Sequence, residues 1–186
     1  MPFIFANFNG TTDDIDVLTH EVGHAYQVRN SFSQPLQEYY WPTSEGAEVH
    51  SMSMEFITMP RMKEFFGKKA LRYEYLHLVN SMKFWPYACA IDEFQQRVYE
   101  QVENPIHSYE QIRQELEKKY LPHRSYQDNP YLQKGNQWKW KAHIFVNPLY
   151  YIDYALAQIC AFQFRIKSQE NFTEAWKDYH HLCTLG

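Results

Sequence analysis

The chain has 186 residues, and its 18 lysine and arginine residues against 22 aspartate and glutamate residues give a formal net charge of -4. This mild acidity offers no basic surface for nucleic acid, and no apolar run approaches the roughly 20 residues that a membrane-spanning helix needs. The three cysteines are widely spaced and form no CxxC pair, which is typical of reduced thiols in the cytoplasm. We therefore expect a cytoplasmic globular protein with one domain over residues 1–186 and with neither a nucleic-acid nor a membrane partner.

The predicted elements are almost all helices. Residues 3–8 alternate weakly between apolar and polar side chains and predict a short strand. Periodic apolar spacing predicts helices over residues 13–30, 43–58, 68–101, 108–120, 149–167 and 171–183. Residues 121–147 contain several prolines and asparagines and a glycine, so we expect an extended loop there. The predicted fold class is mainly α.

The first predicted helix carries a metal-ligand motif. Residues 20–24 read HEVGH, which fits the H-E-x-x-H pattern of zinc peptidases. At helical spacing His20 and His24 lie one turn apart on one face and can bind a single metal ion. Glu21 can then take a proton from a zinc-bound water and pass it to a leaving amine. The alternative is an amphipathic helix with surface histidines, but the helix-start residues 11–14 and the apolar spacing favour the metal site.

A third metal ligand is expected from the second predicted helix, because catalytic zinc usually has three protein ligands and a water. The third histidine of metzincins is absent from the residues that follow the motif, whereas residues 43–58 offer Glu45, Glu48 and Glu55. Glu45 lies in the first turn, where an acidic side chain commonly interacts with the helix dipole. Glu48 and Glu55 lie deeper, on a face with large apolar side chains, where a carboxylate needs a cation or a hydrogen-bond donor.

Taken together, these motifs resemble the oligoendopeptidase F branch of the thimet oligopeptidase family of zinc metallopeptidases. The matching stretches run from end to end and comprise residues 20–27, 45–56, 92–95, 143–154 and 182–186. The resemblance implies a zincin-like helical catalytic domain with the metal site between two helices. Family members are much longer, so we expect the chain to lack their N-terminal lobe and last helices. Apolar surface that this lobe normally covers would then favour self-association.

The resemblance also implies a role for each site residue near the metal. His20, His24 and Glu48 would bind Zn²⁺, and Glu55 would orient a ligand histidine, as carboxylates commonly do beside metal-bound imidazoles. Glu21 would act as the general base. His50, His77 and the remaining histidines show no ligand spacing with the motif, so we expect no direct catalytic role for them.

A second group of site residues is implied farther along the chain. In the family, a histidine and one or two tyrosines contact the tetrahedral intermediate, and a tyrosine hydroxyl can donate a hydrogen bond to its oxyanion. The resemblance points to His143 and Tyr154, with Tyr150 as the second choice among the tyrosines. Tyr151 is assigned to packing.

The expected function is hydrolysis of internal peptide bonds in short oligopeptides by a zinc-dependent metalloendopeptidase. Two alternatives stay open at this point. The chain could be a truncated, catalytically inactive helical fragment that at most binds zinc. It could also be a zinc metallocarboxypeptidase, because carboxypeptidases with the same zinc ligands share much of this scaffold and differ in what closes the substrate groove.

Overall fold

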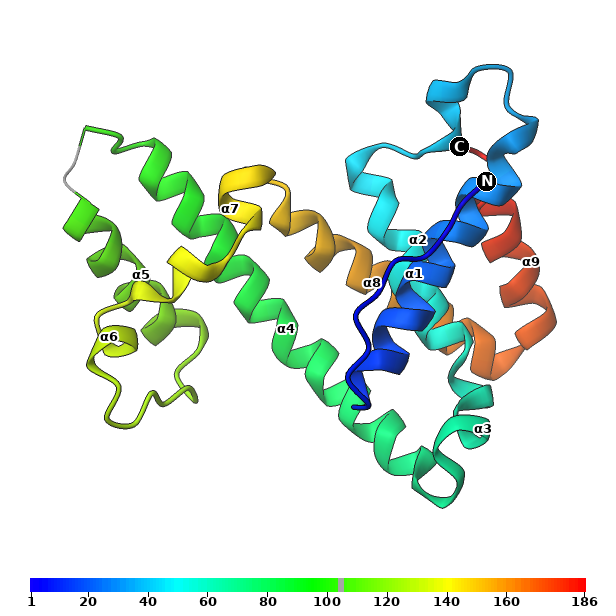
Figure 1. Ribbon diagram of the computed structural model, residues 1–186, viewed down its shortest axis with the longest axis horizontal. Coiled ribbons are helices and arrows are strands. Elements are labelled where there is room, and N and C mark those ends of the chain that lie inside the picture. Colours follow the sequence, from blue (N-terminus) through cyan, green and yellow to red (C-terminus); the bar gives the residue numbers. More distant parts are fainter. Residues whose placement is uncertain (104–105) are drawn as a thin grey trace. The chain divides into compact units, whose positions relative to one another are not determined.

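The computed structural model describes residues 1–103 and 106–186 (Figure 1). By backbone contacts the chain forms two compact units: the first comprises Met1–Val79 with Leu156–Gly186, and the second comprises Asn80–Ala155. All regular elements of the described ranges are helices, which confirms the mainly α fold. None of those helices combines the length and the apolar composition that a membrane span requires.

The first unit is built from helices at both ends of the chain. Its longer helices are α1 (Asp13–Asn30), α2 (Ser44–Ile57), α3 (Met62–Phe66), the beginning of α4 (Ala70–Tyr99), the end of α8 (Tyr151–Glu170) and α9 (Phe172–Leu182). Short 3-10 helices join them at Ser31–Ser33, Gln37–Tyr40, Met59–Arg61 and Gly67–Lys69. Its core contains Met54, Ile57, Tyr179 and Cys183, which brings α2 and α9 together.

The second unit contains the rest of α4, the beginning of α8 and three further helices. These are α5 (Ile106–Tyr120), α6 (Pro130–Gln133) and α7 (His143–Val146), with a 3-10 helix at Asn136–Trp140. One apolar cluster joins α4 to α8 through Ala88, Ile91, Tyr151 and Ala155. A second cluster joins α4 to α5 and the 3-10 helix through Phe94, Ile112, Leu116 and Trp138.

The structure corrects two of the predicted elements. The strand over residues 3–8 is wrong, since residues 1–9 form no regular element. A strand needs a partner strand for its backbone groups, and the described ranges contain no strand that could pair with residues 3–8. The loop over 121–147 is also partly wrong, because it contains α6, α7 and a 3-10 helix. Asn129 starts α6 by accepting hydrogen bonds from the Tyr131 and Leu132 amides. The prolines, asparagines and glycine on which the loop prediction rested gave no sign of this helix start.

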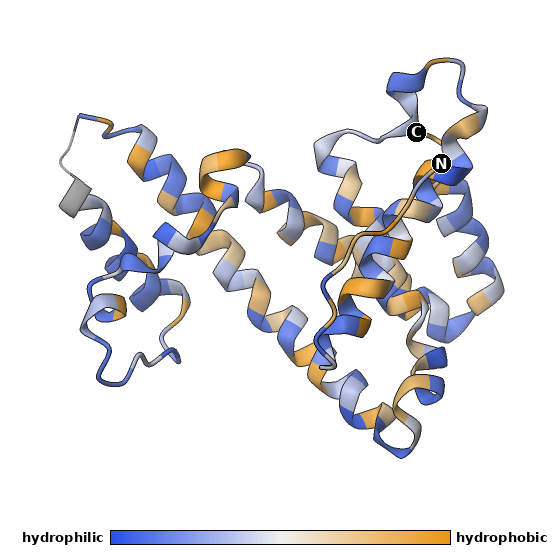
Figure 2. Cartoon of the chain, viewed as in Figure 1, coloured by the Kyte–Doolittle hydropathy of each residue, from blue (hydrophilic) through white to orange (hydrophobic). Residues whose placement is uncertain are grey.

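The N-terminal segment is held by the start of α1 and not by a sheet. The Asp14 carboxylate accepts hydrogen bonds from the Asn9 amide at 3.1 Å and the Gly10 amide at 2.6 Å, whereas the Thr12 hydroxyl makes no capping bond. Phe3 and Phe5 are 87% and 91% exposed, and the segment is visible as a mostly hydrophobic trace in Figure 2.

A glycine sets the distance between α1 and α2. A Cβ atom on Gly23 would lie 2.5 Å from the Ser51 Cα and 2.7 Å from the His50 carbonyl oxygen. Both distances are far inside van der Waals contact, so only glycine permits this approach of the two backbones. The close approach lets side chains on α1 meet side chains on α2 directly.

Candidate metal centre

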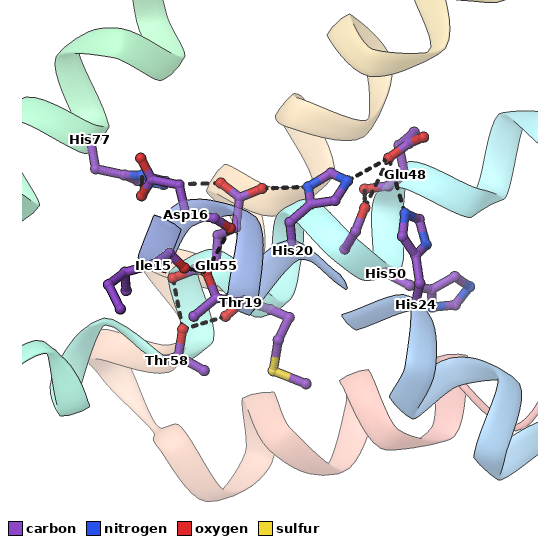
Figure 3. Close-up of polar contacts among 12 residues, drawn as sticks. Ile15, Asp16, Thr19, His20, His24, Glu48, His50, Glu55, Thr58 and His77 are labelled. Atoms are coloured by element: carbon purple, nitrogen blue, oxygen red, sulfur yellow. Dashed lines mark hydrogen bonds and ion pairs between the residues drawn. The ribbon is translucent and has the colours of Figure 1, made fainter. Parts of the chain in front are cut away.

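The two motif histidines of α1 and one glutamate of α2 converge on a single point. Glu48 Oε2 lies 3.2 Å from His20 Nε2 and 3.5 Å from His24 Nε2. The three ligand atoms all lie within 4.8 Å of one another (Figure 3). Helical spacing explains the histidines, and the Gly23 contact explains why Glu48 reaches them.

This donor set has the composition of a catalytic zinc site. Two imidazole nitrogens and one carboxylate leave a fourth position for water or substrate. Glu48 is only 5% exposed, and the Ser51 hydroxyl donates a hydrogen bond to its Oε2 at 2.9 Å. A buried carboxylate beside two imidazoles is stabilised by positive charge, so the residues fit a divalent cation.

Glu55 is placed to orient His20, the first candidate metal ligand. Its Oε1 lies 2.7 Å from His20 Nδ1, the ring nitrogen that faces away from Glu48. Burial lowers the pKa of His20, but hydrogen bonds to Glu48 and Glu55 outweigh burial and raise that pKa to about 10. The two carboxylates therefore favour a positive charge at His20. A bound cation would supply that charge in place of the proton.

The other two acidic candidates occupy different positions. Glu21 is half-buried on α1 beside His20 in sequence, and its carboxylate forms no hydrogen bond or ion pair with the part of the chain that the structure describes. It is thus available to a water or substrate. Glu45 is exposed in the first turn of α2 and does not belong to the converging group.

A second layer of polar side chains lies behind Glu55, and the sequence analysis missed it. His77 on α4 places Nε2 3.3 Å from Glu55 Oε2 and Nδ1 3.0 Å from Asp16 Oδ1. Tyr73, one turn earlier on α4, donates its hydroxyl hydrogen to the same Asp16 oxygen. The sequence holds one usable signal, since Asp16 is four residues before His20 and so lies on the same face of α1.

His50 is a buried histidine between α2 and α9. Its side chain is buried, and its Nδ1 lies 3.5 Å from the Cys183 sulfur. Burial, with a contribution from nearby His24, lowers the pKa of His50 to about 4, so the ring is neutral. The Tyr179 hydroxyl donates a hydrogen bond to the His50 carbonyl oxygen at 2.9 Å, which ties α9 to α2.

The second group of predicted residues forms a cluster of rings within the second unit. His143 begins α7, and its ring lies edge-on to Tyr151 at 5.2 Å and to Tyr154 at 5.8 Å between centroids. Tyr154 also contacts Tyr150 at 5.3 Å. Tyr151 is buried in the α4–α8 cluster, and its hydroxyl accepts a hydrogen bond from Lys141 at 3.1 Å. Burial raises the pKa of Tyr151, which suits a packing residue.

The loop before these tyrosines is held by a buried glutamine. Leu149 has a φ of 65°, a backbone conformation that is unfavourable for a residue with a side chain. Gln95 on α4 accepts a hydrogen bond from the Leu149 amide at 2.8 Å. Gln95 belongs to the stretch 92–95 that carries part of the family resemblance, and this bond gives that residue a structural role.

Comparisons with known proteins agree on one family. The sequence profile of Peptidase family M3 matches residues 1–182, while no curated protein matches the chain. Three solved structures are similar. PZ peptidase A with inhibitor 2 is 51% identical with a TM-score of 0.97, and the match covers 99% of this chain and 33% of that chain. A protein assigned as an oligoendopeptidase F is 51% identical with a TM-score of 0.96 and the same coverage.

The third similar structure comes from Bacillus anthracis str. Ames and is also assigned as an oligoendopeptidase F. It is 47% identical with a TM-score of 0.84, and the match covers 99% of this chain and 30% of that chain. The chain thus spans about a third of the length of these solved structures. The two structures assigned as oligoendopeptidase F support the resemblance to that branch, and the profile match over residues 1–182 shows that the chain belongs to Peptidase family M3.

Proposed function

We propose that the chain carries the catalytic metal centre of a zinc-dependent endopeptidase that hydrolyses internal bonds of short oligopeptides. The observation that carries the proposal is the convergence of His20, His24 and Glu48, with their ligand atoms within 4.8 Å of one another. Membership of a peptidase family and similarity to structures assigned as oligoendopeptidase F support the substrate class.

The metal would be held by the two imidazole Nε2 atoms and the Glu48 carboxylate. Zinc bound there would supply a Lewis acid that polarises a peptide carbonyl and lowers the pKa of water. With the metal bound, Glu55 would keep the remaining hydrogen of His20 on Nδ1, 2.7 Å from its Oε1, and Nε2 would be the ligand atom. The Ser51 hydroxyl donates to Glu48 Oε2, the same oxygen that faces the two histidines, and would hold that oxygen in place.

Glu21 would move the proton. Its carboxylate accepts a proton from the attacking water and returns it to the leaving amine, as a general base and then a general acid. His143 and Tyr154 would donate hydrogen bonds to the oxyanion of the tetrahedral intermediate. Tyr150 is the alternative donor, since its ring packs against Tyr154 in the same cluster.

The test combines zinc analysis with cleavage of an internally quenched peptide whose C-terminus is amidated. We expect one zinc per chain, cleavage at an internal bond, and a Glu21→Gln variant that retains zinc while kcat falls by about 10²–10⁴. Glu45→Gln, an exposed glutamate on α2, is the control and should change neither quantity.

Each other outcome favours a specific alternative. Zinc binding without cleavage indicates an inactive metal-binding fragment. Shortening of peptides only when their C-terminus is free indicates a carboxypeptidase. Parental turnover by Glu21→Gln shows that the general-base assignment is wrong.

A further inference from the structure

A row of alternating carboxylates and imidazoles extends from His20 away from the ligand group. Glu55 uses one oxygen for each of two histidines, with Oε1 2.7 Å from His20 Nδ1 and Oε2 3.3 Å from His77 Nε2. The side chains come from three helices, since His20 is on α1, Glu55 on α2 and His77 on α4. Figure 3 shows His77, Glu55 and His20 in this order, ending at Glu48.

The other ring nitrogen of His77, Nδ1, also faces a carboxylate. This atom lies 3.0 Å from Asp16 Oδ1, and the Tyr73 hydroxyl donates to the same oxygen. The His77 side chain is only 6% exposed, and its ring lies edge-on to Phe56 with centroids 4.9 Å apart. The ring is therefore held by the Asp16 contact at Nδ1, by the ion-pair distance to Glu55 at Nε2 and by its T-shaped packing with Phe56.

This arrangement limits the motion of Glu55. A glutamate carboxylate that is held at one oxygen can still rotate about its last bond, because that torsion is broad. The His77 contact at the second oxygen restricts that rotation and keeps Oε1 directed at His20. A His20 ring that stays in one orientation presents Nε2 to the metal without first losing rotational freedom.

We propose that His77, supported by Asp16 and Tyr73, is a positioning residue that raises metal affinity by fixing Glu55 and, through it, His20. The inference rests on the proposed zinc site and concerns residues that do not themselves bind the ion. Outer partners of metal ligands typically change metal affinity by about 10–100-fold when they are replaced.

The test is the zinc dissociation constant, measured by competition with a chromophoric chelator, together with the unfolding midpoint of the metal-free chain. We expect His77→Leu to weaken zinc binding by about tenfold or more. His77→Gln should weaken it less, because the side-chain amide can place a hydrogen-bond donor near the Glu55 carboxylate. Tyr73→Phe removes only the hydroxyl that holds Asp16, keeps the ring, and should weaken binding by a few-fold.

Tyr179→Phe is the matched control. It also removes one hydroxyl that is bonded within the first unit, since the Tyr179 hydroxyl donates to the His50 carbonyl oxygen at 2.9 Å. That bond is outside the row from His20 to Asp16, so the variant should lower the unfolding midpoint without changing zinc affinity. The inference is supported if Tyr73→Phe binds zinc more weakly than Tyr179→Phe while the two variants have similar unfolding midpoints.

Two results overturn the inference in distinguishable ways. If the unsubstituted chain and all the His77 and Tyr73 variants bind zinc equally well, His77 is only a packing residue and the zinc site itself stands. If the unsubstituted chain binds no zinc, the proposed function fails and this inference fails with it.

Discussion

The metal-ligand group of the first unit and the ring cluster of the second unit show two different ways of building a site. In the first, polar atoms face defined partners, from Asp16 through Glu55 to Glu48. In the second, His143 and the tyrosines meet through ring edges and faces at 5.2 to 5.8 Å. The polar contacts of the first group indicate which atom faces which partner. The ring contacts of the second group do not indicate which tyrosine hydroxyl would donate to an oxyanion.

The largest expected effect comes from removing the proposed carboxylate ligand. Glu48→Ala should abolish most zinc binding. The loss of zinc affinity should exceed the change of about 10–100-fold that follows from replacing a residue behind a metal ligand. Zinc content after dialysis measures it, with exposed Glu45→Ala as the control. Full zinc content in Glu48→Ala would mean that another carboxylate is the ligand.

The next effect separates the tyrosines of the second unit. Tyr154→Phe should lower kcat by about 10²–10³, the usual effect of losing one donor to an oxyanion. Tyr151→Phe should leave kcat nearly unchanged and lower stability by about 1 kcal/mol, because the Lys141 ammonium loses an acceptor. Steady-state kinetics on the quenched peptide measures kcat for both variants. A larger fall in kcat for Tyr151→Phe than for Tyr154→Phe would exchange the roles of the two tyrosines.

A smaller effect tests the contact between α1 and α2. Gly23→Ala should reduce the free energy of unfolding by about 1–3 kcal/mol, because the added methyl collides with the α2 backbone. It should also weaken zinc binding as the helices separate. Gly46→Ala is the control, since its Cβ would lie 3.6 Å from the Pro42 Cβ, an ordinary contact. Equal stability of both variants in denaturant would show that the close approach does not matter.

The smallest effect concerns the loop before Tyr150. Gln95→Met keeps the length of the side chain but removes the acceptor for the Leu149 amide. Because Leu149 is 46% exposed and water can replace the acceptor in part, we expect a loss of about 1 kcal/mol. Urea unfolding measures this loss, and zinc affinity should stay constant. A fall in zinc affinity would link the glutamine to the metal group.

The sequence predicted those parts of the molecule that depend on spacing along one helix. Periodic apolar residues located the long helices, and the four-residue step from His20 to His24 placed both imidazoles on one face. Glu48 and Glu55 could be chosen because buried carboxylates need partners, although the resemblance supplied their separate roles.

Features that depend on contacts between distant segments could not be predicted in this way. His77 lies on α4, far along the chain from His20, and only the packing of α4 brings it to Glu55. The strand over residues 3–8 failed because alternation says nothing about a pairing partner. The α6 helix was missed because a side-chain cap, here Asn129, decides so short an element. The α7 helix has only four residues and no side-chain cap, so the sequence carries no start signal for it.

The most direct measurement of the central claim is anomalous X-ray scattering at the zinc edge from a crystal grown with zinc. The account predicts one strong peak at about 2.0–2.2 Å from His20 Nε2, His24 Nε2 and a Glu48 oxygen, with His20 Nδ1 still bonded to Glu55. A crystal in which zinc binds elsewhere, or in which these three side chains do not share one ion, would contradict it.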